Sequence, residues 1–156
     1  GMMEVGRKKV DELQKNGELT TQIEFQYGDA TSLELSSESF DTVTVAFGVR
    51  NFSSLSKGLS EMCRVLRPGG CLAILEMTEP ENPIYKLGYK IYTKLCIPIL
   101  AKLFSKDMKA YDYLPNSIAA FPQGDKMKEA LKRSGFTDVE IRKFTMETCT
   151  FYLAIK

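Results

Sequence analysis

Histidine and tryptophan are both missing from this chain of 156 residues. Without histidine, no mechanism can use an imidazole base, and no metal site can have histidine ligands. The four cysteines form no C-x-x-C pair, because they are spread along the chain as Cys63, Cys71, Cys96 and Cys149. We therefore expect no metal site, and we expect reduced, buried cysteines in a cytoplasmic protein.

An excess of one charge and long apolar runs are also lacking. The chain has 21 basic and 20 acidic residues, so its overall charge does not indicate a nucleic-acid partner. No uncharged stretch is long enough to span a bilayer, and no signal peptide is visible. The sequence contains no internal repeat and no low-complexity linker. We expect residues 1–156 to form a single domain with its own core.

A glycine-rich loop of the form G-x-G-x-x-G is missing as well, although residues 63–76 are typical of folds that carry one. The stretch CRVLRPGGCLAILE predicts a helix whose apolar stripe ends at Leu66, then a sharp reversal at Gly69 and Gly70. A buried strand over residues 71–75 follows. This order is typical of a parallel sheet, and parallel sheets of this type commonly bind a nucleotide-like cofactor.

Hydrophobic periodicity predicts the other elements. The predicted helices cover residues 2–16 (ended by Gly17), 55–66, 84–104 (with a break at Pro98) and 125–134 (ended by Gly135), with a loop and short helix over 111–122. The predicted strands cover 21–29, 40–48, 71–75, 138–144 and 149–156. The first is expected at a sheet edge with Ile23, Phe25 and Tyr27 inward, the second is apolar enough for a central strand, and the last two form an antiparallel pair.

Polar residues follow two of the predicted strands. Asp29 lies at the carboxyl end of the first strand, where open α/β sheets bind ligands, and its carboxylate can accept the exocyclic amino group of an adenine. The stretch FGVRN, residues 47–51, ends the next strand. Gly48 allows a ligand close to the backbone, and Arg50 and Asn51 offer donors to an oxygen atom. Taken singly, each of these residues is also consistent with a solvated turn or surface position.

The order of these features resembles a class I S-adenosylmethionine-dependent methyltransferase, an α/β fold with a Rossmann-like, mostly parallel sheet and a C-terminal antiparallel strand. More narrowly, FGVRN, RVLRPGGCLAILEMTEP and YDYLPNSIAAFP are similar to the UbiE/MenG/Coq5 family, which C-methylates polyprenylated quinols in menaquinone and ubiquinone biosynthesis. The motif R-V-L-R-P-G-G is common among methyltransferases, and its combination with F-G-x-R-N makes the resemblance specific. The resemblance extends over residues 1–156.

This resemblance implies a methyltransferase with S-adenosyl-L-methionine as cofactor and a polyprenyl quinol as substrate, of the demethylmenaquinol or 2-polyprenyl-benzoquinol type. Its cofactor-binding positions match Asp29, Ala30, Phe47 and Gly48. Arg50 is the expected catalytic residue, and because a guanidinium is a poor base we expect it to stabilise the phenolate or to orient a water. The expected substrate-binding residues are Asn51, Tyr111 and Tyr113, with aromatic packing an equal alternative for the tyrosines.

The family's glycine-rich loop, the strands beside it and its ribose-binding acid would precede residue 1, so the chain resembles the C-terminal two-thirds of such an enzyme. The missing strands would lie between residues 21–29 and 40–48 in the sheet. We therefore expect the strand over 40–48 to expose a long apolar edge, which a further piece of the sheet, a rearrangement or a homodimer would cover. A fragment that binds no cofactor and is inactive by itself is the alternative interpretation.

Lysines recur at multiples of four along residues 84–106, and an apolar stripe runs opposite them. These lysines are Lys86, Lys90, Lys94, Lys102 and Lys106, and the stripe begins with Ile84, Leu87, Ile91 and Leu95. A surface helix with hydrated lysines explains the pattern. An interfacial helix that touches anionic lipid explains it too, and it suits a substrate whose polyprenyl tail lies in the bilayer. Peripheral membrane contact is thus a second hypothesis for a cytoplasmic protein.

Overall fold

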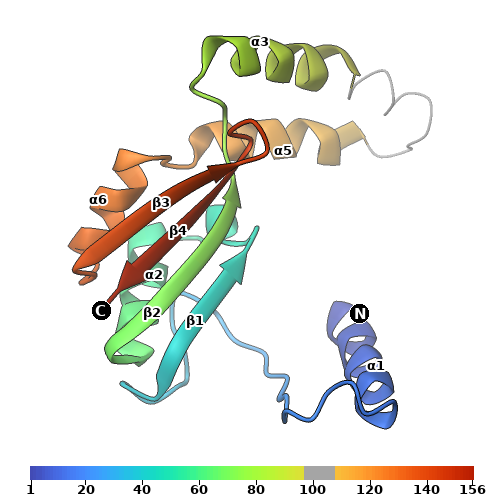
Figure 1. The fold of residues 1–156 in the computed structure, drawn as a ribbon, viewed down its shortest axis with the longest axis vertical. Coiled ribbons are helices and arrows are strands. Elements are labelled where there is room, and N and C mark those ends of the chain that lie inside the picture. The colour runs from blue at the N-terminus through green and yellow to red at the C-terminus, as the bar shows by residue number, and fades with distance from the viewer. Residues whose placement is uncertain (97–107) are drawn as a thin grey trace.

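A mixed sheet forms the centre of the structure, a computed structural model that describes residues 1–96 and 108–156 (Figure 1). Its strands are β1 (Phe40–Ala46), β2 (Leu66–Met77), β3 (Asp138–Phe144) and β4 (Cys149–Ile155). Their order in the sheet is β1–β2–β4–β3. β1 and β2 are parallel, whereas β4 is antiparallel to both β2 and β3. The predicted α/β class and the terminal antiparallel pair are confirmed.

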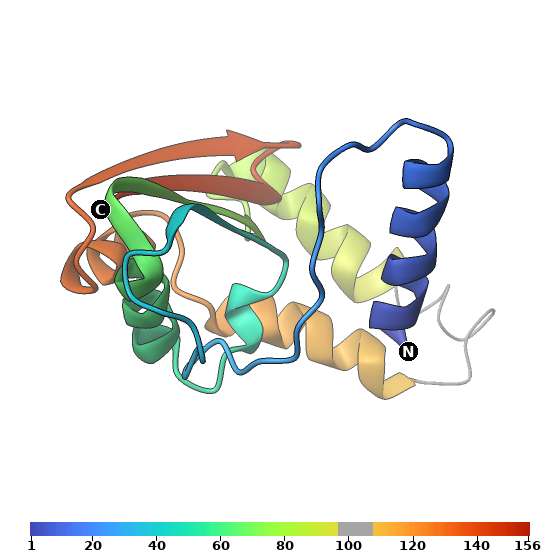
Figure 2. The same ribbon diagram turned by 90° about the horizontal axis from the view of Figure 1, so that it is seen from below.

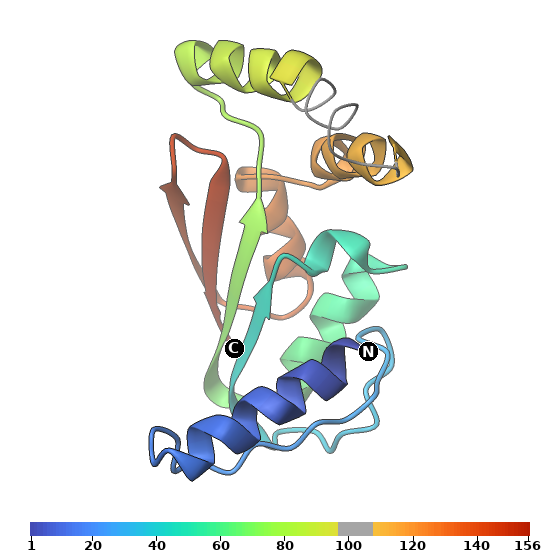
Figure 3. The same cartoon turned by 90° about the vertical axis from the view of Figure 1, so that its right-hand side faces the viewer.

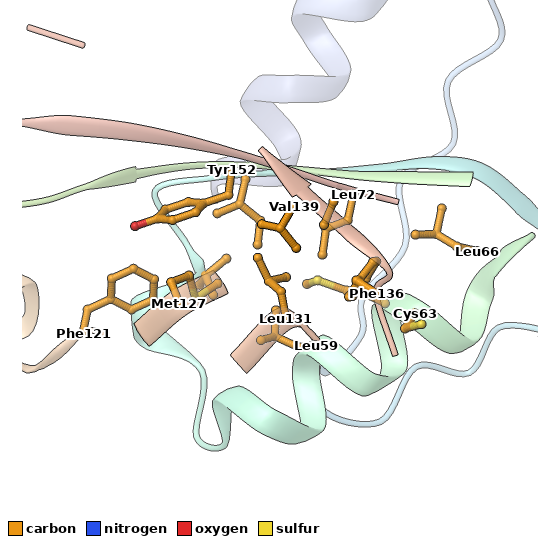
Figure 4. Packing of buried hydrophobic residues seen from close by; sticks show 14 residues of the cluster. Leu59, Cys63, Leu66, Leu72, Phe121, Met127, Leu131, Phe136, Val139 and Tyr152 are labelled. Atoms are coloured by element: carbon orange, nitrogen blue, oxygen red, sulfur yellow. The ribbon is translucent and has the colours of Figure 1, made fainter. Parts of the chain in front are cut away.

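Two helices cover one face of the sheet (Figures 1 and 3): α2 (Leu55–Val65) and α6 (Asp125–Arg133). Figure 4 shows the core between these layers, in which Leu59 of α2 and Leu131 of α6 lie against Leu72 and Tyr152 of the sheet. All four side chains are fully buried. Each contributes about 1.5–3 kcal/mol relative to an exposed position, so this core dominates the stability of the domain. The helix predicted over residues 55–66 is confirmed as far as Val65, and its apolar stripe faces this core.

The reversal between α2 and β2 lies where the sequence predicts it, but the strand begins earlier. β2 starts at Leu66, which we expected to end the helix, and it includes both glycines of the Pro-Gly-Gly turn. Gly69 has a φ of +78°, in the left-handed region. A Cβ on Gly70 would lie 2.9 Å from the carbonyl oxygens of Arg67 and Asp41. The parallel strand therefore approaches too closely for any side chain at this position.

The other face and one edge of the sheet are less covered. Apolar side chains on that face, among them Ala73 and Leu75 of β2 and Phe151 and Leu153 of β4, are half-buried. The burial predicted for β2 is therefore complete on one face only, because both core helices pack on the same side. Among the described residues β1 pairs with β2 alone. The exposed edge expected for the strand over 40–48 is confirmed.

The first helix, α1 (Met2–Lys15), lies beyond the β1 edge of the sheet (Figures 1 and 2). It is followed at Gly17, as predicted, by a left-handed residue with a φ of +72°. Two backbone bonds close its end, the first from Gly17 to Gln14 at 3.1 Å and the second from Glu18 to Leu13 at 2.9 Å. This pairing is the Schellman arrangement in which glycine is favoured.

The strand predicted over residues 21–29 is wrong, because this segment has no regular secondary structure. Its side chains do not point inward as expected: Ile23 is 43% exposed and Tyr27 is 88% exposed. A strand needs a hydrogen-bonded neighbour, and among the described residues none lies beside this segment. Phe25 packs against α1 instead, with the Arg7 guanidinium 5.9 Å from its ring centre.

Two helical segments lie beyond the carboxyl ends of β1 and β2 (Figure 1). They are α3 (Pro83–Ile91), continued by the π-helix η2 (Tyr92–Cys96), and α5 (Met108–Ala120). The amphipathic helix predicted from residue 84 is confirmed as far as residue 96, and the break predicted at Pro98 lies outside the described residues. No helix in residues 1–96 or 108–156 is long and apolar enough to cross a membrane.

The loop and short helix predicted over residues 111–122 are wrong, because α5 is one continuous helix to Ala120. The prediction rested on an aromatic-rich stretch bounded by proline. Pro115 nevertheless lies inside the helix, although proline removes a backbone donor there. Ile118 is buried next to that proline, at 2% exposed, and Phe121 is buried just after the helix. The free energy gained by burying these side chains offsets the cost of a proline inside a helix. Local sequence preference alone does not reveal this burial.

Candidate functional site

The chain turns sharply after β1, at the edge of the sheet where we expect ligands. Phe47 has a φ of +56°, which is uncommon for a residue with a side chain, and its N–H still donates to the Leu75 carbonyl at 2.8 Å. The 3-10 helix η1 (Val49–Asn51) follows, and the buried Val49 side chain anchors it to the core. Phe47, 44% exposed, and Gly48 thus lie at the carboxyl end of β1, as the sequence predicts.

Arg50 points inward from η1. Its side chain is only 10% exposed, so a solvated surface arginine, the competing interpretation, is wrong. Nη1 donates to the Phe47 carbonyl at 3.0 Å and also to the carboxylate of Glu76. The Arg50 backbone N–H donates to the same carboxylate, with 3.3 Å between N and Oε2. The backbone and the guanidinium are therefore held by one acidic group.

Glu76 is a functional candidate that the sequence analysis missed. It lies near the end of β2 on the face that packs against α2 and α6, and its side chain is fully buried. Besides both contacts from Arg50, it accepts a hydrogen bond from the Met77 N–H at 2.9 Å. The signal was a carboxylate at the end of an otherwise apolar strand, since ionised groups are rarely buried without a partner. Its partner, 26 residues earlier, could not be read from the strand itself.

The substrate-binding residues predicted on η1 and α5 are partly brought together. The Tyr113 hydroxyl donates to Oδ1 of Asn51 at 2.8 Å, and it links α5 to the turn that carries Arg50. The Tyr113 side chain is 58% exposed, so its aromatic face is open to a ligand and is not packed in the core. Tyr111 lies on α5, and its side chain is outside the described residues. The structure therefore supports one of the two tyrosines as a neighbour of the site.

Asp29 and Ala30 lie in a loop that packs on α2. Oδ1 of Asp29 accepts hydrogen bonds from the backbone N–H and the hydroxyl of Thr31, both at 2.8 Å. The backbone bond from Thr31, followed by the hydroxyl bond, lowers the pKa of the Asp29 carboxyl below its usual value. Among the described residues no hydrogen bond joins this loop to residues 47–51. The two halves of the predicted cofactor site are therefore held separately.

An apolar cavity of about 440 Å³ lies between α3, η2 and the turn from β3 to β4. Its lining is aromatic and aliphatic: Ile84, Tyr85, Gly88, Tyr89, Tyr92, Met146 and Thr148. The β3–β4 turn is tied to the start of α3, because Glu147 accepts the backbone N–H groups of Glu81 and Asn82, both at 2.8 Å. The Asn82 bond is the main cause of the lowered pKa of Glu147. These two hydrogen bonds hold the β3–β4 turn, which forms one side of the cavity, against the start of α3.

The arrangement at the end of β1 can stabilise a negatively charged oxygen. A nearly buried guanidinium interacts strongly with an anion, because little water screens it. Within residues 1–96 and 108–156 no group of three or more side chains converges as metal ligands do. A cationic group, a tyrosine hydroxyl and an amide side chain are thus the polar groups that the described site offers to a ligand.

The whole chain, residues 1–156, matches the ubiE/COQ5 methyltransferase family. It is 52% identical over 156 residues to a demethylmenaquinone methyltransferase of Bacteroides fragilis, covering 100% of this chain and 62% of that protein. It is 46% identical over 134 residues to a protein of the same name from Chlorobaculum parvum, covering 86% of this chain and 56% of that protein. The chain therefore spans about three-fifths of the length of these relatives.

Two of the solved structures with a similar fold are methyltransferases by name. An S-adenosylmethionine-dependent methyltransferase from Aquifex aeolicus has a TM-score of 0.56 and 16% identity, with coverage of 93% of this chain and 60% of that chain. An S-adenosylmethionine-dependent methyltransferase from Thermotoga maritima has a TM-score of 0.54 and 18% identity, with coverage of 83% of this chain and 62% of that chain. At these identities the likeness shows the fold alone.

Proposed function

The chain belongs to the ubiE/COQ5 methyltransferase family, and from this premise we propose that it acts in the methylation of a ring carbon of demethylmenaquinol, with S-adenosyl-L-methionine as methyl donor, in menaquinone biosynthesis. The demethylmenaquinone methyltransferases that are 52% and 46% identical to it favour this quinol over a ubiquinone precursor. The structural observation that carries the proposal is the buried Arg50, held at the carboxyl end of β1.

When bound, S-adenosyl-L-methionine supplies an electrophilic methyl group on a sulfonium centre. A quinol ring carbon would accept that methyl group, with S-adenosylhomocysteine as the leaving group and the ring proton lost to water, and the ring is more nucleophilic once a quinol hydroxyl has lost its proton. A guanidinium is a poor base, so we assign Arg50 the role of stabilising the phenolate oxygen or of orienting the water that accepts the proton. The position of Arg50 beside Asn51 and Tyr113 suits contacts with a quinol oxygen.

The residues assigned to the cofactor fit it in chemistry. Both Thr31 donors go to Oδ1 of Asp29, so Oδ2 keeps its capacity to accept the amino group of an adenine. The lowered pKa of Asp29 keeps that acceptor ionised. Ala30 follows with a backbone N–H that suits a ring nitrogen. Phe47 and Gly48, at the turn after β1, would face the remainder of the cofactor.

We further propose that α3 and η2 touch an anionic membrane surface, where a polyprenyl quinol is found. The apolar residues along one side of these helices, Ile84, Leu87, Ile91 and Leu95, are all more than half exposed. Lys86, Lys90 and Lys94 lie beside them on the same helical segment. An exposed apolar stripe with lysines at its side is typical of interfacial helices. This contact would make the protein membrane-peripheral.

The test of the proposed function is methyl transfer by the full-length enzyme. Demethylmenaquinol and a 2-polyprenyl-benzoquinol are each supplied with S-adenosyl-L-methionine, and the methylated product is identified by mass spectrometry. We expect demethylmenaquinol to be methylated. Methylation of the benzoquinol alone would move the protein to ubiquinone biosynthesis, and methylation of neither quinol would refute the proposal.

The membrane proposal is tested separately, by sedimentation of the same protein with lipid vesicles. We expect binding to vesicles that contain phosphatidylglycerol and little binding to neutral phosphatidylcholine vesicles, because lysines attract anionic lipid. Leu87→Glu is expected to abolish the binding, and Leu19→Glu, which lies outside α3 and η2, serves as a charge-matched control. Equal binding of all three proteins would refute the membrane contact.

A further inference from the structure

Glu76 devotes most of its hydrogen-bonding capacity to one residue. Oε1 accepts from Nη1 of Arg50 and from the Met77 N–H, and Oε2 accepts from the Arg50 backbone N–H. Two of the three described donors to this carboxylate therefore belong to Arg50. The same carboxylate fixes the backbone of η1, from which Arg50 extends, and the tip of its side chain.

Stability alone does not explain a carboxylate at this position. Leu72 and Ile74, the residues of β2 that point to the same face as Glu76, are fully buried and apolar. A buried ion pair is often no more stable than well-packed apolar residues of similar volume, because both charges lose their hydration. The pair does, however, restrict the guanidinium to one place. The structure thus favours a role in geometry over a role in stability.

Two nitrogen atoms of the Arg50 guanidinium, Nε and Nη2, donate no hydrogen bond to a described residue. Nη1 is shared between Glu76 and the Phe47 carbonyl. Nε is buried and has no hydrogen-bond partner among the described residues, and no hydrogen bond from Nη2 to a described residue is present. A buried donor without an acceptor is rare in folded proteins. Nε and Nη2 form one edge of the guanidinium, which suits an oxygen of a ligand.

We propose that Glu76 is a positioning residue for the methyl transfer: it holds Nη1 of Arg50 so that the Nε–Nη2 edge is presented to the quinol oxygen. This inference rests on the proposed function for the role of Arg50. Glu76 itself touches no substrate, and it acts through the arginine. The negative charge of Glu76 also keeps the buried guanidinium neutralised before the phenolate forms.

The test is a double-mutant cycle in the full-length enzyme, with wild type, Glu76→Gln, Arg50→Met and the double variant. Glutamine keeps the volume of Glu76 but places an amide group against the donors of Arg50. We expect Glu76→Gln to lower kcat by about 10-fold or more while KM for S-adenosyl-L-methionine stays within about 2-fold. In the Arg50→Met background the same change is expected to alter kcat by less than about 2-fold. An equal loss of kcat in both backgrounds would overturn the proposal.

A second measurement is independent of catalysis. Nitrogen-15 NMR of arginine side chains reports the exchange and mobility of the Arg50 Nε–H, which we expect to be slow and ordered in wild type and averaged in Glu76→Gln. The control is Glu140→Gln, which removes the carboxylate of an exposed pair with Arg142. An unchanged Arg50 signal in folded Glu76→Gln would refute the positioning role. If wild type methylates no quinol, the proposed function fails, and the NMR result still decides whether Glu76 orders Arg50.

Discussion

Three residues of the turn after β1 each have a distinct structural role. Phe47 adopts a left-handed backbone conformation, Val49 anchors the turn in the core, and Arg50 is drawn inward to Glu76. A left-handed conformation costs an ordinary residue roughly 1–2 kcal/mol, and it persists only where neighbouring contacts determine it. Backbone strain of this kind is commonly found at functional sites.

Arg50→Ala is expected to lower kcat by about 100-fold or more, because its charge is used when the phenolate develops. KM for S-adenosyl-L-methionine is expected to change little. Steady-state kinetics of the full-length enzyme with a quinol acceptor gives both constants, and a thermal melt confirms that the variant is folded. Arg142→Ala, at an exposed pair on β3, is the matched control. Normal turnover in folded Arg50→Ala would remove the catalytic role.

Asp29→Ala is expected to weaken cofactor binding in the full-length enzyme by roughly 1–3 kcal/mol, the cost of leaving a buried amine without its acceptor. Calorimetry with S-adenosylhomocysteine measures this change. Asp41→Ala, which removes the partner of Arg67 at the start of β1, is the control and should bind as wild type does. If both variants bound equally well, Asp29 would lie outside the cofactor site.

At the scale of the elements, the close contact of β1 with the start of β2 depends on a missing side chain. We expect Gly70→Ala to destabilise the protein by about 1–3 kcal/mol, because the new methyl group would collide with two backbone carbonyls that cannot move independently. Urea unfolding gives the free energy. Gly28→Ala, where a Cβ meets nothing within 4 Å, is the control and should stay within about 0.5 kcal/mol of wild type. Comparable stability of both variants would contradict the close approach.

The loop before β1 is tied to α2 by Glu61 and by Arg64, which donates to the Leu33 and Leu35 carbonyls, and the contribution of Glu61 depends on pH. Glu61 accepts hydrogen bonds from Arg64 at 2.7 Å and from the Leu33 N–H at 2.8 Å, and the arginine contact is the main cause that lowers its pKa from 4.5 to about 2. The ionised form is therefore favoured in the fold. Its contribution is complete above pH about 4.5 and disappears as the pH falls toward 2.

Glu61→Gln is accordingly expected to lower stability at pH 7 and to flatten the fall in unfolding free energy between pH 4.5 and pH 2. Urea titrations at a series of pH values measure this slope. Glu129→Gln serves as the control, since its pair with Arg133 is exposed and 4.0 Å long. An acid slope in Glu61→Gln as steep as that of wild type would show that the contact does not form in solution.

At the scale of the whole molecule, the residues proposed to bind the cofactor lie on two separate parts of the 156-residue chain. Asp29 is exposed on a loop bonded to α2, and residues 47–51 lie on a separate turn. β1 forms the edge of the described sheet, and its far side offers no neighbour that would close a pocket. The sequence contains no G-x-G-x-x-G loop that could bind the rest of the cofactor.

We expect this chain by itself to bind S-adenosyl-L-methionine weakly and to methylate no quinol. Several hydrogen bonds to charged groups, at about 1.5–3 kcal/mol each, would be missing, which moves a micromolar ligand beyond millimolar. Calorimetry with S-adenosylhomocysteine on the purified 156-residue polypeptide measures the affinity, and analytical ultracentrifugation shows whether the β1 edge pairs two copies. Micromolar binding by the monomer would prove this expectation wrong.

The sequence by itself determined the elements whose signals are local. Periodicity and end signals located α1, α2, α6 and the β3–β4 pair, because burial of one face and the conformation of a glycine are properties of neighbouring residues. The family was likewise evident, since its motifs are short and contiguous. Phe47, Gly48 and Arg50 were expected at the end of a strand for the same reason, and they lie there.

Only the tertiary structure decided the features that depend on partners far along the chain. Residues 21–29 alternate like a strand but form none, because no described strand lies beside them. α5 includes Pro115 because burial at Ile118 outweighs a local preference. Glu76 belongs to the site through a contact with Arg50, 26 residues away in the sequence. These hydrogen bonds and buried contacts join residues that are far apart in the sequence. They can be identified only when the relative positions of the strands and helices are known.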